Sequence, residues 1–134
     1  MSDIHSENMS IEVDHEIRRL LFAQWGPIDK LNAIKSFHFL HDVAGFDPGY
    51  DTLVDYRNIT EVNLDFKELM NILKDAKEIE KRTGRGALVV GQDKGRYIFA
   101  QLFCEVAARF SGAIIRYKAF KTIEEAEIWL DGTP

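Results

Sequence analysis

The clearest indication of the fold is Leu53-Val54-Asp55-Tyr56-Arg57, a short apolar run that ends in polar and charged residues. It predicts a strand over residues 52–56, and a capped helix that begins near Asp65 follows it. A second strand over 87–90 leads through a glycine-flanked turn into another amphipathic helix. A third strand over 114–120 precedes a short final helix. Strands that alternate with helices favour a sheet covered by helices.

Upstream of this stretch the sequence predicts a hairpin and one more helix. Residues 10–14 alternate apolar and polar side chains, as a half-exposed strand does. The partner strand over 17–25 is apolar on both faces, which predicts a central place in the sheet. Gly26-Pro27 ends that strand, and Pro27 suits the first turn of a helix. The predicted fold is a single-domain α/β protein with a mixed sheet and the element order ββαβαβαβα.

Length and composition predict one domain behind a short tail. The chain has 134 residues, of which 46% are apolar and 29% charged, as in ordinary globular proteins. Residues 1–8 predict a disordered N-terminal tail, and the domain then spans residues 9–131. We expect no signal peptide and no membrane span. Cys104 is the only cysteine, so no intrachain disulfide can form and a reducing, cytoplasmic setting is expected.

The net charge indicates which classes of partner the protein can bind. It is −5, and lysines and arginines do not cluster along the chain. Binding to nucleic acid depends on cations that neutralise phosphates, so we expect no nucleic-acid partner. We expect no membrane partner either. A homodimer through the first strand or through the region around Phe39 stays open.

The element order, the stretch 53–57 and the ending Ala119-Phe120-Lys121-Thr122-Ile123-Glu124-Glu125-Ala126-Glu127-Ile128-Trp129-Leu130 together resemble the SpoIIAA-like family of bacterial proteins. Its relatives are the STAS domains of sulfate transporters and anti-sigma-factor antagonists, and the family is also grouped with CRAL-TRIO lipid-binding domains. The resemblance runs from about Met9 to Leu130. It implies a STAS-like fold.

The resemblance implies a comparison with anti-sigma-factor antagonists. In those proteins the switch is a serine at the start of the helix after the third strand. A partner kinase phosphorylates that serine, and the added charge repels the partner. The equivalent position here is Leu64 or Asp65, and a serine kinase can phosphorylate neither. Asp65 and Glu68 instead have the spacing of a capping box. We therefore expect a helix cap in place of the phosphorylation switch.

Three further sequence patterns are explained better by a structural role than by a binding or catalytic one. The loop 91–95 lies between a strand and a helix, where an anion can bind, but it lacks the Walker spacing and Asp93 would repel a phosphate. His38 and His41 have a spacing that suits metal ligands but lack further ligands, so we interpret them as imidazoles along a core stripe. Cys104 is interpreted as a small core hydrophobe. We expect no catalytic residues, no metal and no cofactor.

The leading functional hypothesis is a non-enzymatic regulatory or protein-interaction module. Its contact surface would run from the end of the third strand into the following helix. The partner-binding residues would be Arg57, Asn63, Asp65 and Glu68.

The alternative hypothesis is a carrier or sensor of a small apolar, lipid-like ligand. Two neighbouring aromatics, Phe39 and Phe46, suggest a partner site or the mouth of an apolar pocket. That pocket would lie between the first helix and the sheet. Its lining would be Trp25, Phe37, Phe39 and Phe46.

Overall fold

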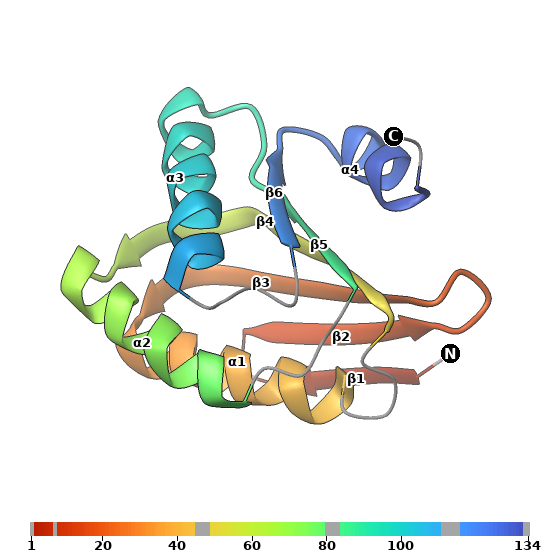
Figure 1. The fold of residues 1–134 in the computed structure, drawn as a ribbon, viewed down its shortest axis with the longest axis horizontal. Coiled ribbons are helices and arrows are strands. Elements are labelled where there is room, and N and C mark those ends of the chain that lie inside the picture. The colour runs from red at the N-terminus through yellow and green to blue at the C-terminus, as the bar shows by residue number, and fades with distance from the viewer. Residues whose placement is uncertain (1, 7, 45–48, 80–83, 111–115, 133–134) are drawn as a thin grey trace.

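The computed structural model describes residues 2–6, 8–44, 49–79, 84–110 and 116–132 (Figure 1). Six strands and four helices occur in these ranges. In chain order they are β1 (Ser2–Ser6), β2 (Met9–Asp14), β3 (Arg19–Asp29), α1 (Lys30–Ala44), β4 (Asp51–Asn63), α2 (Phe66–Ile79), β5 (Arg85–Val89), α3 (Lys94–Phe110), β6 (Arg116–Phe120) and α4 (Ile123–Leu130).

The six strands form one mixed sheet whose spatial order follows the chain, from β1 to β6. The neighbouring pairs β1–β2 and β2–β3 are antiparallel, whereas β3 to β6 are parallel. The strand β3 has a neighbour on each side, which confirms the central position that its two apolar faces predicted. The predicted mixed α/β sheet with four helices is therefore confirmed.

The N-terminal end of the chain differs from its prediction. Residues 2–6 form β1 and pair with β2, in a register that sets Ile4 opposite Ile11, so the prediction of a disordered tail is wrong for them. The free edge of β2 offers unpaired N–H and C=O groups, which attract a further strand whatever its side chains are. Composition alone does not reveal such an edge.

The strand β3 also runs farther than the sequence predicted. Gly26-Pro27 does not end it; the strand continues to Asp29 beside β4, with register shifts at Ala23/Trp25 and Gly26/Pro27. The last β2 partner of β3 is Met9, opposite Gln24. Beyond that point β3 has no β2 neighbour, so Pro27 loses no sheet hydrogen bond on that side.

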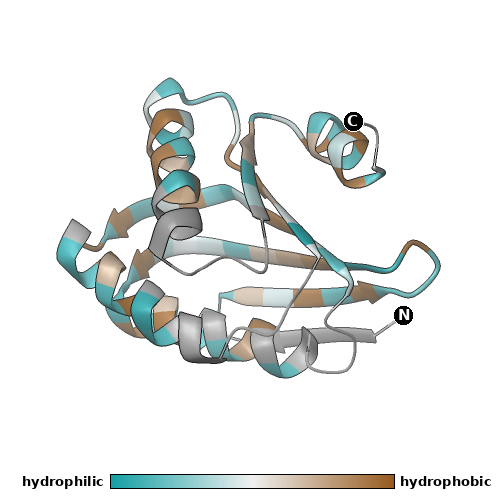
Figure 2. Cartoon of the chain, in the orientation of Figure 1, coloured by the Kyte–Doolittle hydropathy of each residue, from teal (hydrophilic) through white to brown (hydrophobic). Residues whose placement is uncertain are grey.

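The helices cover the sheet from two sides. Val54, Leu88 and Ala119 point to the face that α1 and α3 cover, whereas Leu53 and Val89 point to the face that α4 covers. When parallel strands follow one another in one direction across a sheet, right-handed crossovers place the connecting helices on the same face. In Figure 2, α3 and α4 are banded in teal and brown, as expected for helices with one side on a sheet.

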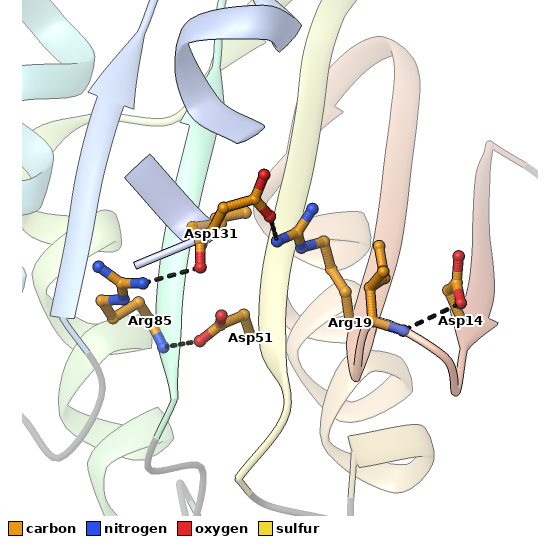
Figure 3. A network of polar contacts seen from close by, with 7 residues as sticks. Asp14, Arg19, Asp51, Arg85 and Asp131 are labelled. Carbon is orange, nitrogen blue, oxygen red and sulfur yellow. Dashed lines mark hydrogen bonds and ion pairs between the residues drawn. The ribbon is translucent and has the colours of Figure 1, made fainter. Parts of the chain in front are cut away.

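A polar network fixes α4 to the sheet (Figure 3). The side chain of Arg19 is buried, and its Nη2 donates to Asp131 Oδ1 at 2.8 Å. Arg85 Nη2 donates to the carbonyl oxygen of Leu130 at 2.8 Å, and its backbone N–H donates to Asp51 Oδ1 at 2.9 Å. Within the described residues Arg19 Nε has no partner, so Asp131 is the group that neutralises this buried cation.

We predict that Asp131→Ala lowers the free energy of unfolding by about 1–2 kcal/mol, because it leaves a buried guanidinium without its counter-charge. The exposure of Asp131, 63%, keeps this loss below that of a fully buried pair. Urea denaturation measures it. Glu127→Ala removes the same charge from an exposed position of α4 and serves as the control. Equal stability of the two variants would contradict the prediction.

Candidate ligand cavity

A cavity of about 370 Å³ lies between the sheet and the three helices α1, α2 and α3. Its walls are mostly apolar and come from six different elements. The apolar lining includes Ile28 of β3, Ala33 of α1, Ile59 of β4, Ile72 of α2, Val90 after β5, and Phe103 of α3.

The hollow results from small side chains where a helix meets the sheet. Ala33 and Ser36 of α1 and Ala100 of α3 are all buried and line the cavity. At such positions larger side chains would normally fill the space to the density of a protein interior. Three small residues on two helices therefore leave room that the neighbouring side chains do not occupy.

The cavity reaches solvent beside two apolar side chains. Phe99 of α3 and Val62 of β4 line it, and they are 50% and 49% exposed. Ile98 and Leu102, two other apolar residues of α3, are also about half exposed. The buried side of α3 includes Ala100, which also lines the cavity.

Gln24 is the unusual residue of the cavity. It lies on β3, is 1% exposed and lines the hollow. Neither its Nε2 nor its Oε1 has a hydrogen-bond partner among the described residues. An unpaired buried polar group costs about 1–3 kcal/mol, so a side chain like this one requires an explanation. Leu20 and Phe22, which precede it at alternate positions, belong to the main core.

The other polar groups of the cavity have different surroundings. Ser36 Oγ donates to the carbonyl oxygen of Ala33 at 2.8 Å and so is satisfied within α1. Arg96 is half-buried in the first turn of α3 and is the charged residue among the described lining. The cavity thus combines an apolar wall, one buried amide without a partner and one cation.

We predict that Gln24→Leu raises the free energy of unfolding of the ligand-free protein by about 1–2 kcal/mol, because it removes a buried amide that has no partner. Ser36→Ala, in the same cavity, removes a satisfied hydroxyl and should lower stability by about 1 kcal/mol. Urea denaturation of both variants tests this opposition. A loss of stability in Gln24→Leu would show that the amide is satisfied in solution.

The aromatic residues predicted to line a ligand pocket do not form this cavity as far as they are described. Trp25 is 38% exposed and Phe39 packs against the main core, and neither lines the cavity. The side chain of Phe37 and all of Phe46 lie outside the described part of the chain. The prediction placed the pocket between the first helix and the sheet; the cavity does touch both, but α2 and α3 also enclose it.

The four residues predicted to bind a partner are spread from the middle of β4 to the first turn of α2. Arg57 is tied to Asp55: its Nε and Nη2 donate to the two carboxylate oxygens, each at 2.9 Å. Burial alone raises the pKa of Asp55, but the hydrogen bonds and charge of Arg57 outweigh burial, so the pKa lies below its ordinary value. The pair therefore adds stability above that ordinary pKa and loses it as the pH falls through the lowered one.

Asn63, Asp65 and Glu68 also make local contacts. Asn63 Nδ2 donates to Glu61 Oε1 at 2.8 Å. The backbone N–H of Glu68 donates to Asp65 Oδ1 at 2.7 Å, and the N–H of Asp65 donates to Glu68 Oε1 at 3.2 Å. This reciprocal pair confirms the capping box. A substitution of Asp65 therefore disturbs a helix cap before it reports on any partner.

The remaining sequence patterns are also placed. Asp93 caps α3, because its Oδ1 accepts the N–H of Arg96 at 2.8 Å, so a carboxylate already occupies the amides that an anion would need. His38 is exposed, which makes its predicted core position wrong, and the side chain of His41 is not described. No group of three or more potential metal ligands occurs within the described ranges. None of the helices described there is long and apolar enough to cross a bilayer.

Cys104 is buried in the main core, as predicted. Burial, with a smaller effect of the Glu105 charge, raises the pKa of its thiol to about 12. We predict that N-ethylmaleimide at neutral pH labels the native protein far more slowly than the urea-unfolded chain, because the thiol is both protonated and covered. Equal rates in the two states, followed by mass spectrometry, would contradict this burial.

Comparison with known proteins supports the fold. No protein-family model and no curated protein matches the chain. Among solved structures, a similar one is an uncharacterised protein from the DUF3478 family with a SpoIIAA-like fold, from Shewanella loihica PV-4. The two chains are 18% identical with a TM-score of 0.61, and the similarity covers 97% of this chain and 98% of that chain. The chain therefore has a SpoIIAA-like fold, as its sequence implied, and the likeness transfers no function.

Proposed function

We propose that this protein is a non-enzymatic module that carries or senses a small, mostly apolar molecule. The observation that supports the proposal is the apolar cavity of about 370 Å³ beneath α1, α2 and α3. Its volume lies at the lower end of the range of ligand sites, and such sites combine apolar walls with few polar groups. The resemblance to a group that includes lipid-binding domains agrees with it.

The energetics favour a neutral, apolar occupant. Each methylene group that leaves water for an apolar wall contributes about 0.8 kcal/mol, so a chain of several carbons supplies useful affinity without any ion pair. The small residues Ala33 and Ala100 leave the space that such a chain would fill. The single cysteine and its burial suit a reducing compartment, so we assign the module to the cytoplasm.

We predict that methyl octanoate raises the melting temperature of the wild-type protein. A ligand present at about 100 times its Kd adds about 2.7 kcal/mol to the free energy of unfolding, a shift of several degrees. Ala100→Leu fills the cavity and should abolish the shift. Trp25→Ala, on the same strand as Gln24 but outside the cavity, should retain it and is the matched control.

Native mass spectrometry provides an independent measurement. A small molecule that leaves the wild-type protein on collisional activation, and that is missing from Ala100→Leu, supports the carrier. Failure of methyl octanoate and of other apolar molecules of similar size to bind the wild-type protein would refute the proposal.

A protein-interaction module is the second candidate. Its supporting observation is the length of β4, which extends to Asn63, whereas its described pairs with β5 end at Asp55. An edge of this kind can accept an added strand from a partner. A bare chain in native mass spectrometry, together with a partner captured through residues 57–63, would favour this candidate over the carrier.

A further inference from the structure

We propose that Gln24 recognises the polar end of the ligand, and that this end presents a hydrogen-bond donor and an acceptor side by side, as a primary amide or a neutral carboxylic acid does. The inference rests on the proposed function, because it concerns the occupant of the same cavity. It adds a recognition residue, a chemical class and an orientation.

The burial of Gln24 carries the inference. The side chain is 1% exposed and lines the cavity, and both of its polar atoms lack a partner within the described ranges. A side-chain amide offers two N–H donors and one carbonyl acceptor at adjacent atoms. A single group with an acceptor beside a donor satisfies both ends of such an amide at once. Swapping the assigned nitrogen and oxygen of Gln24 leaves this requirement unchanged.

A charged carboxylate fits Gln24 less well. It has no donor for Gln24 Oε1, and its charge would enter a mostly apolar space at a high desolvation cost. Tyr56 and Arg96 are the titratable or charged residues among the described lining. Arg96 is half-buried in the first turn of α3. It is the group that would bind an anion if the polar end were charged.

The positions of Gln24 and the mouth set the orientation. Gln24 is fully covered, whereas Phe99 and Val62 line the cavity and are half exposed. The polar end of the ligand therefore enters first and pairs with the amide. The apolar chain then extends toward Phe99 and Val62, where apolar side chains cover it.

Three compounds that share the same octanoyl chain test this assignment. Octanamide has a donor and an acceptor, methyl octanoate has acceptors only, and octanoic acid loses its donor when it ionises. In the wild-type protein, isothermal titration should show octanamide binding at least about tenfold more tightly than methyl octanoate. The affinity for octanoic acid should fall as the pH rises through the pKa of the free acid, while that for octanamide stays constant.

Variants separate recognition from folding. Gln24→Leu should lose the preference for octanamide and keep its affinity for methyl octanoate. Gln24→Met retains the length of the side chain without donors and should behave in the same way. Trp25→Ala should keep the wild-type preference. The unliganded melting temperature of each variant shows whether it is folded.

Each adverse result has a distinct meaning. If all three compounds bind the wild-type protein equally, or if octanamide remains preferred in both Gln24 variants, the role of Gln24 is overturned while the carrier function stands. Octanoate binding that persists at high pH and disappears in Arg96→Gln would assign recognition to the cation and also overturn it. If none of the compounds binds, the carrier function itself fails.

Discussion

The parallel ladder between β3 and β4 is the interaction on which most of the structure depends. It runs from the pair Arg19/Asp51 to the pair Asp29/Asn63, with two register shifts along it. The ladder joins the antiparallel half of the sheet to the parallel half. It also carries both strands past the described ends of their other neighbours, so that Ile28 and Ile59 meet α1 and α2 in a separate apolar cluster. That cluster forms one side of the cavity.

The two faces of the sheet differ in how completely they are packed. On one face α4 brings Ala126 and Leu130 against buried strand residues, and the network of Arg19, Asp131 and Arg85 fixes its end. On the other face small residues of α1 and α3 leave a hollow whose wall holds an unpaired amide. Wall atoms without neighbours lose dispersion energy, and the amide loses its hydrogen bonds to water. A cost of this kind, confined to one place, is typical of a functional site in an otherwise consistent fold.

The fold limits what the comparison with known proteins can teach. A SpoIIAA-like architecture is shared with a protein that is 18% identical, and architecture alone hosts many functions. The argument for a ligand therefore rests on features of this chain. The cavity is created by the side chains of Gln24, Ser36 and Ala100 in combination, and not by the backbone of the fold.

Features that depend on residues close together in the chain could be predicted from the sequence. Strand periodicity placed the central strand and the alternation of strands with helices, and a spacing of three residues placed the cap Asp65–Glu68. Such patterns are readable because a helix cap or an amphipathic face involves residues close in the chain. Burial of Cys104 followed in the same way from its apolar neighbours.

The other features became visible only in the folded protein. The pairing of β1, the extension of β3 through Pro27, the exposed position of Phe99 and the missing partners of Gln24 all depend on what lies opposite in space. In the sequence Gln24 is a polar residue at the end of an apolar run, and the sequence does not show whether water solvates its side chain. Whether an amide meets water, a partner or an apolar hollow is set by three helices, of which α2 and α3 are distant from it along the chain, so the candidate site emerged only with the packing.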